Sequence, residues 1–127
     1  MPFMRVTVPS NVSAQSNAAL AKDLTNFSVT TLRKPREMTT VTFVRVEPSE
    51  YFIGGEAVEP GPGIHLEVSL TTGTNSADER KRFIKEVSES IVRIYGPNAT
   101  LRGVALTEYL PESYGYEGIT RYERSHR

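Results

Sequence analysis

The sequence is built from two similar halves, and this repeat limits the possible folds more than any other feature. When residues 64–118 are aligned with residues 2–55, hydrophobic and glycine positions coincide at an offset of 62 to 63. The matched pairs include Val6 with Val68, Leu24 with Val87, Tyr51 with Tyr114, and Gly55 with Gly118. Similarity at one fixed offset indicates an internal duplication, so each half is expected to fold as the same unit.

Strands are predicted at both ends of each unit. Apolar and polar residues alternate near Met4–Val8 and at Ile64–Leu70, which is the period of a half-buried strand. A second strand is predicted in each half, at Val41–Val46 and at Val104–Leu110. Short extended pieces that end in glycine follow these strands, at Tyr51–Gly55 and at Tyr114–Gly118.

A helix is predicted between the two strands of each half. In the first half a helical pattern runs from Val12 to Leu32, with Ser13 as a plausible N-cap. In the second half Ser76 and Glu79 have the spacing of a capping box, and Gly96-Pro97 is a strong stop. Strands joined through a helix pair in parallel by a right-handed crossover.

These elements predict an α+β fold: a duplicated βαβ unit whose four-stranded mixed sheet carries two helices on one face. We expect one domain over residues 1–127, with the repeat at 2–55 and 64–118. The predicted linker covers residues 56–63 and the predicted C-terminal tail covers residues 119–127. Two helices leave the other sheet face uncovered, so the fold also predicts an oligomer.

Composition excludes several classes of function. Fifteen basic and fifteen acidic residues balance, so no net field attracts nucleic acid or an anionic membrane. The basic stretch at residues 33–36 is interpreted as a solvated connection. The chain has no cysteine, and His65 and His126 stand alone, so we expect no metal site and no cofactor. No leader or membrane-spanning run is recognised, which predicts a cytoplasmic protein.

Pro2 has two interpretations. Proline suits the first residue of a strand, where its missing N–H costs no hydrogen bond. Alternatively, Met1 is removed and Pro2 carries a free secondary amine at the end of a rigid strand. Such an amine, if neutral, can take a proton from a substrate and return it elsewhere.

The interpretation of Pro2 as a free amine is supported by a resemblance of nearly the whole chain to a known group of enzymes. The duplicated βαβ unit with proline after the initiator resembles the tautomerase superfamily, which includes 4-oxalocrotonate tautomerase, chloroacrylic acid dehalogenases and malonate semialdehyde decarboxylase. The resemblance runs from Pro2 to Gly118 and includes "VTFVRVEPSEYFIGG", "SADERKRFIKEVSESI" and "LTEYLPESYGYEG". It is strongest to the fused 4-oxalocrotonate tautomerases and the cis-3-chloroacrylic acid dehalogenases. It implies a homotrimer of the duplicated unit and Pro2 as the catalytic acid and base.

The resemblance also implies substrate contacts. Thr72 and Asn75 occupy the positions of the relatives' carboxylate-binding arginines, and neither carries charge. The position of the relatives' water-activating glutamate falls at Tyr116, with Glu117 next to it. Further candidates are Arg102, Arg5 and Tyr114, of which Tyr114 matches an aromatic residue that closes the relatives' pocket. Ser28 and Ala105 replace a histidine and a tyrosine of the dehalogenases, so dehalogenation of that kind is not expected.

Three hypotheses follow for the function. The first is a tautomerase or isomerase in which Pro2 transfers a proton on a small enol or 2-oxo acid. The second is a hydratase, dehalogenase or decarboxylase of a small unsaturated or oxo acid that uses protonated Pro2. The third, from another class, is a trimeric binding or structural protein with a vestigial site.

Overall fold

The computed structural model describes residues 2–58, 63–99 and 103–126. The first half contains β1 (Phe3–Pro9), α1 (Ala14–Thr30), β2 (Thr40–Val46), β3 (Phe52–Ile53) and β4 (Glu56–Ala57). The second half contains β5 (His65–Thr71), α2 (Ala77–Tyr95), β6 (Gly103–Tyr109), β7 (Gly115–Tyr116), β8 (Ile119–Thr120) and α3 (Arg121–Ser125). Single turns of 3-10 helix precede β2, β3 and β7, at Arg36–Met38, Pro48–Glu50 and Pro111–Ser113.

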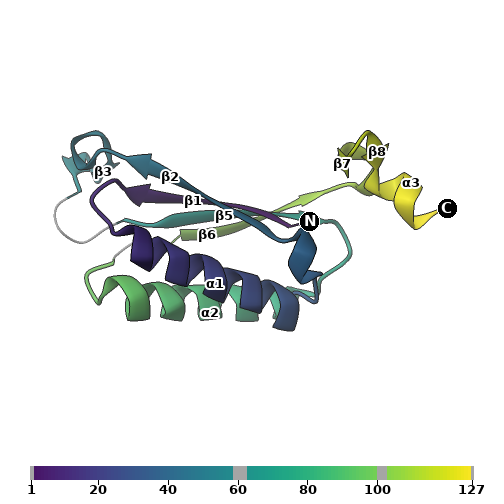
Figure 1. Ribbon diagram of the computed structural model, residues 1–127, viewed down its shortest axis with the longest axis horizontal. Coiled ribbons are helices and arrows are strands. Elements are labelled where there is room, and N and C mark those ends of the chain that lie inside the picture. Colours follow the sequence, from purple (N-terminus) through teal and green to yellow (C-terminus); the bar gives the residue numbers. More distant parts are fainter. Residues whose placement is uncertain (1, 59–62, 100–102, 127) are drawn as a thin grey trace.

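Four strands form one mixed sheet in the order β2-β1-β5-β6. β1 is parallel to β2 and β5 is parallel to β6, whereas β1 and β5 run antiparallel at the centre. Each βαβ unit therefore forms half of the sheet, and the halves join through their first strands. Both long helices lie against the same face (Figure 1). The predicted fold class is confirmed.

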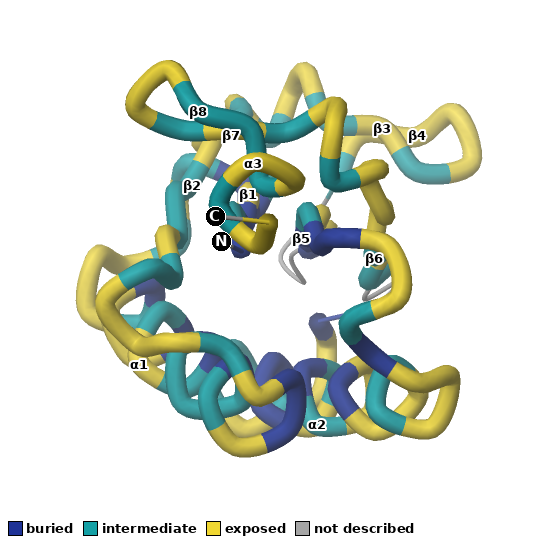
Figure 2. The backbone as a smooth tube through the Cα atoms, turned by 90° about the vertical axis from the view of Figure 1, so that its right-hand side faces the viewer, coloured by how far each residue is buried: buried dark blue, intermediate teal, exposed yellow. Residues whose placement is uncertain are grey.

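The core lies between the sheet and the two helices. Alternate side chains of the central strands point toward the helices and are at most 1% exposed: Met4, Val6, Val8, Leu66, Val68 and Leu70. The buried residues of the helices meet them, among them Leu20, Leu24, Phe83, Val87 and Ile91. Figure 2 looks along the strands and shows α1 and α2 side by side below the sheet.

The helix ends follow the predicted caps. The Ser13 hydroxyl accepts a hydrogen bond from the Ser16 N–H at 3.0 Å, ahead of α1. Ser76 and Glu79 form both hydrogen bonds of a capping box at the start of α2. Gly96 ends α2 with a φ of +101°, a value that glycine accepts without strain.

The predicted linker and tail both contain secondary structure. Residues 56 and 57 form β4 because Gly54 and Gly55, with φ of +61° and +81°, turn the chain back onto β3. Glu117 and Gly118 make the equivalent turn at +54° and +80°, and β8 then pairs with β7. The segment predicted as a C-terminal tail therefore contains β8 and α3.

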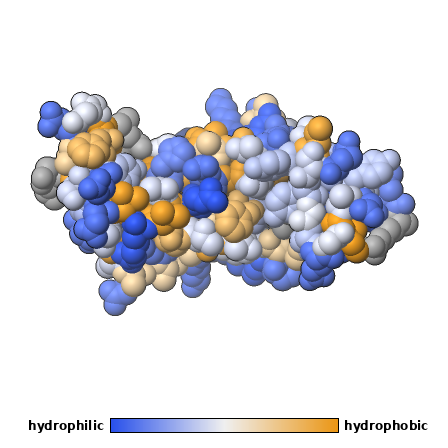
Figure 3. Space-filling view, turned by 90° about the horizontal axis from the view of Figure 1, so that it is seen from above, coloured by the Kyte–Doolittle hydropathy of each residue, from blue (hydrophilic) through white to orange (hydrophobic). Residues whose placement is uncertain are grey.

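The opposite face of the sheet has no helix over it within the described residues. Its side chains include the exposed Arg5 and Glu67, whose nearest charged atoms lie 3.9 Å apart, and Val44, which is 42% exposed. Figure 3 looks onto this face and shows hydrophobic side chains between hydrophilic ones. None of the helices in the described ranges is long and apolar enough to cross a membrane.

Candidate active site

Pro2 directly precedes β1 and is buried. Its carbonyl oxygen accepts a hydrogen bond from the Thr40 N–H at 3.0 Å, which ties it to the start of β2. On the other side, Phe3 pairs with Ser69 across the antiparallel ladder, so Pro2 lies next to Leu70 near the end of β5. Pro2 is therefore held between the start of β2 and the end of β5.

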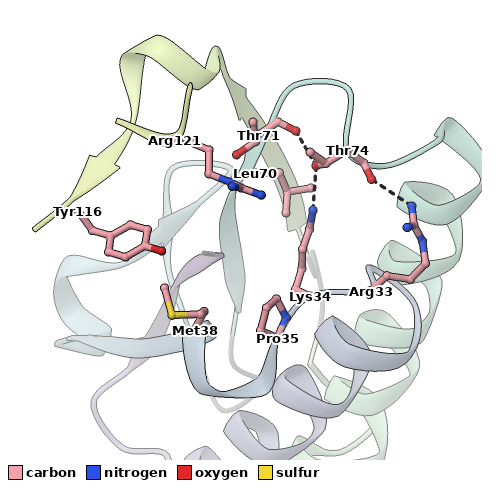
Figure 4. Close-up of a pocket in the computed structure, with 9 residues that line it drawn as sticks. All are labelled: Arg33, Lys34, Pro35, Met38, Leu70, Thr71, Thr74, Tyr116 and Arg121. Atoms are coloured by element: carbon pink, nitrogen blue, oxygen red, sulfur yellow. Dashed lines mark hydrogen bonds between the residues drawn. The ribbon is translucent and has the colours of Figure 1, made fainter. Parts of the chain in front are cut away.

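A cavity of about 370 Å³ opens at this same end of the sheet (Figure 4). Leu70 and Thr71 supply one wall from the end of β5, and Met38 supplies another from the turn before β2. The remaining walls come from the segment after α1, from Thr74, and from the C-terminal hairpin and helix. Pro2 itself does not line the cavity, but the lining residue Leu70 and the segment at residues 38–40, which supplies Met38, also flank Pro2.

Lys34 brings a positive charge into the cavity wall. Its ammonium group donates a hydrogen bond to the Thr74 hydroxyl at 2.8 Å, and that hydroxyl donates to the Thr71 carbonyl oxygen at 2.7 Å. Burial lowers the pKa of Lys34 from its ordinary value, and the nearby charges of Arg33 and Arg121 lower it further. The charge of Glu79 acts in the opposite direction, but it does not cancel these effects, and within the described residues Lys34 forms no ion pair with a carboxylate.

Arg121 and Tyr116 come from the C-terminal hairpin and α3. The Arg121 N–H donates to the Tyr114 carbonyl oxygen at 2.8 Å, and the side chain extends toward the cavity (Figure 4). The Tyr116 hydroxyl points toward the cavity as well (Figure 4). The Arg124 guanidinium stacks 3.9 Å from the centre of the Tyr116 ring and donates to the Tyr116 carbonyl oxygen at 2.9 Å. Arg124 thereby holds Tyr116 in place.

Arg33 joins the two halves at the cavity rim. Its Nε lies 2.6 Å from Glu79 Oε2 and its terminal nitrogen lies 3.1 Å from Glu79 Oε1, a two-point contact. The same nitrogen donates to the Thr74 carbonyl oxygen at 3.1 Å. This contact, with hydrogen bonds from the Ser76 N–H and the Asn75 amide, holds the pKa of Glu79 far below its usual range.

Thr72 and Asn75 are not among the residues that line this cavity. The Asn75 amide is buried and donates to the Leu32 carbonyl oxygen at 2.9 Å, and Thr72 is exposed. Thr71 and Thr74 line the cavity instead. The intervening Gly73 has a φ of +81°, and a left-handed turn of this kind changes which side chains face inward.

Tyr114 and Arg5 lie elsewhere. Both line a second cavity of about 240 Å³ on the open face of the sheet, together with Phe3 and Glu67. The Tyr114 ring lies 6.0 Å from the Tyr109 ring at a tilted angle. The structure thus places these two candidates at a separate cavity on the open sheet face, which Phe3, the residue after Pro2, also lines.

The side chains of the neighbouring residues Tyr116 and Glu117 lie in different surroundings, because Glu117 is at the tip of the β7–β8 hairpin. Tyr116 lines the first cavity, whereas Glu117 is exposed and takes a φ of +54° at the tip of the hairpin. Tyr116 pairs with Ile119, so the register contains no slip that would bring Glu117 inward. Arg102 lies outside the described residues.

Lys34 and Arg121 were not among the candidates from the sequence. The first belonged to a predicted solvated connection and the second to a predicted tail. One signal pointed to Lys34: in a βαβ unit, the chain leaving the helix returns to the edge where the first strand begins. Pro2 directly precedes that strand, so the residues between α1 and β2 are expected near it. In the described part of the chain, no cluster of three or more potential metal ligands is present.

Comparisons with known proteins agree with the fold. Residues 1–113 match the sequence profile of a family described as "Putative oxalocrotonate tautomerase enzyme". No curated protein sequence matches the chain.

Several solved structures share the fold at low sequence identity. The asymmetric trimer of F6 fused 4-OT is 19% identical over 94% of this chain and 96% of its own, with a TM-score of 0.85. N1, a member of the cis-3-chloroacrylic acid dehalogenase family, is 17% identical over 93% and 82%, with a TM-score of 0.82. FG41 malonate semialdehyde decarboxylase inhibited by 3-bromopropiolate is 18% identical over 98% and 97%, with a TM-score of 0.80. With the family match over most of its length, the chain belongs to the oxalocrotonate tautomerase family of the tautomerase superfamily.

Proposed function

We propose that the protein is a tautomerase of small enol or 2-oxo acids, and that Pro2, freed by removal of Met1, is its acid and base. The observation that carries the proposal is the place of Pro2: it directly precedes β1 and is held to the start of β2, and the segments that flank it also line a cavity that contains Lys34 and Arg121. Family membership supports proton transfer as the type of chemistry.

The proposed reaction needs one group that both accepts and returns a proton. The neutral secondary amine of Pro2 takes the proton of the enol hydroxyl while the carbonyl forms. The resulting ammonium then delivers a proton to the carbon that was part of the enol double bond, which regenerates the amine. An α-amine in a model peptide titrates near pH 8. Burial favours the neutral form of an amine, and the buried position of Pro2 supports a base that works at neutral pH.

The second candidate is a hydratase, dehalogenase or decarboxylase that keeps Pro2 protonated. Burial of Pro2 opposes a protonated amine, and the exposed Glu117 is poorly placed to activate a water in the cavity. Both features favour the tautomerase. We also propose that three chains assemble into a homotrimer that covers the open sheet face, because solved fused 4-OT structures are trimers.

The test is conversion of phenylenolpyruvate and 2-hydroxymuconate, followed by loss of enol absorbance, with release of chloride from both 3-chloroacrylate isomers as the comparison. We expect tautomerisation and little or no chloride release. In Pro2→Ala a primary amine replaces the ring nitrogen, so kcat should fall by a factor on the order of 10²–10⁴ or less, while the circular dichroism spectrum stays unchanged. A processed protein that tautomerises neither enol would favour the binding protein with a vestigial site.

A further inference from the structure

We infer that Lys34 and Arg121 together bind the carboxylate of the substrate, and that the substrate is a monocarboxylate with an apolar remainder. The inference rests on the proposed function, because it assigns the substrate contacts of that same site. It moves the anion-binding role away from the turn at residues 72–75 to two residues from opposite ends of the chain.

The geometry places the two cations on opposite sides of one cavity. Lys34 reaches it from the segment between α1 and β2, and Arg121 reaches it from the start of α3 (Figure 4). Their separation is small enough for the charge of Arg121 to lower the pKa of Lys34. An anion between them would therefore interact with both at once.

Charge balance indicates a missing anion. Arg33 at the rim is already neutralised by its two-point contact with Glu79. Among the residues that the structure describes, no carboxylate forms an ion pair with Lys34 or with Arg121. Bringing two like charges into a half-enclosed space costs free energy, and a bound carboxylate would offset that cost.

The other residues that line the cavity indicate the chemical character of the part of the ligand outside its carboxylate. Met38, Pro35 and Leu70 present apolar surface beside the two cations, and Tyr116 adds an aromatic ring with a hydroxyl that can donate a hydrogen bond. Because Arg33 is already paired with Glu79, the described cavity offers one subsite for an anion, between Lys34 and Arg121. A dicarboxylate such as 2-hydroxymuconate would carry a second charge for which the described lining offers no further cation, because Arg33 is already paired with Glu79. The site therefore favours phenylenolpyruvate.

The C-terminal part of the site lies beyond the family match, which ends at residue 113. Tyr116, Arg121 and the supporting Arg124 all belong to this following segment. The carboxylate contact made by Arg121 is thus a feature of this chain that the matched profile does not include.

The first measurement is calorimetric titration of the processed protein with 3-phenylpropionate, an unreactive monocarboxylate. We expect Lys34→Met and Arg121→Met each to weaken binding on the order of tenfold, because each removes one charged hydrogen-bond donor. Lys34→Arg and Arg121→Lys keep the charge and should retain most of the affinity. Arg36→Met is the matched control, since Arg36 is exposed, donates to Asn26 and does not line the cavity.

The second measurement is steady-state kinetics with phenylenolpyruvate and its neutral methyl ester. The two methionine variants should raise KM for the acid more than they lower kcat, and they should lose much less with the ester. 2-Hydroxymuconate should show a lower kcat/KM than phenylenolpyruvate in the wild type. A structural role alone would affect acid and ester equally.

The outcomes separate this inference from the proposed function. Unchanged 3-phenylpropionate binding in both methionine variants would overturn the inference, even if the protein tautomerises enols. Weakened binding in these variants would support the carboxylate site, even if the processed protein converts no enol, in which case the proposed function fails alone.

Discussion

Arg33 contacts Glu79 with two nitrogen atoms while its own backbone takes a φ of +59°, a left-handed conformation that residues other than glycine rarely adopt. The equivalent residue of the second half is Gly96, also at positive φ. The first half thus places a strained arginine where the second has glycine, and this arginine connects the end of α1 with the capping box of α2.

This conformation predicts different costs for two substitutions of Arg33. Both Arg33→Gly and Arg33→Ala lose the contact with Glu79, but only glycine accepts the left-handed backbone without strain. Arg33→Ala should therefore be less stable than Arg33→Gly by about 1 kcal/mol. Urea denaturation checks this, and equal stability of the two variants would contradict the assigned backbone conformation.

The Arg33 contact also predicts a pH dependence. Because the pKa of Glu79 in the folded protein lies well below its ordinary value near 4.5, its charge stabilises the fold at neutral pH. That stabilisation is fully present above 4.5 and is lost as the pH falls toward the folded pKa. Glu79→Gln should be less stable than the wild type at pH 7, and the difference should shrink below pH 4.5. Glu89→Gln, at an exposed site on the same helix, is the control.

The charge of Lys34, which we propose binds the substrate carboxylate, should destabilise the fold. Its pKa in the folded protein lies below the ordinary 10.5, so its charge destabilises the fold at neutral pH. This cost is fully present below the folded pKa and disappears as the pH rises to 10.5. Lys34→Met should therefore be at least as stable as the wild type at pH 7 in thermal unfolding, with its advantage falling toward pH 10.5. A marked loss of stability at pH 7 would show that Lys34 mainly supports the fold through Thr74.

The open sheet face should be buried between chains. We expect light scattering at micromolar concentration to give the mass of a trimer. Val44→Arg on this face should dissociate the trimer, whereas Ile84→Arg, at a similarly exposed site on α2, should leave it intact. A stable monomer in the wild type would contradict the assembly.

The sequence predicted the elements better than the site. Strand alternation, helix caps and the repeat depend on local chemistry and on one hydrophobic period, and the structure agrees with them. The lining of the cavity depends instead on turn conformations: the positive φ of Gly73 puts Thr71 and Thr74 on the cavity where Thr72 and Asn75 were candidates. Arg121 could not be placed from its charged surroundings, because its position depends on the turn at Glu117 and Gly118.

The central claim is that the amine of Pro2 transfers the proton. The most direct measurement compares kcat/KM for phenylenolpyruvate between two forms of the same chain, one beginning at Pro2 and one that retains Met1, each verified by intact mass. Retention of Met1 converts the amine into an amide without a basic nitrogen. The account predicts that the form beginning at Pro2 is active, with activity that rises with pH through a pKa below about 8, and that the form with Met1 is nearly inactive. Equal activity of the two forms would contradict the mechanism.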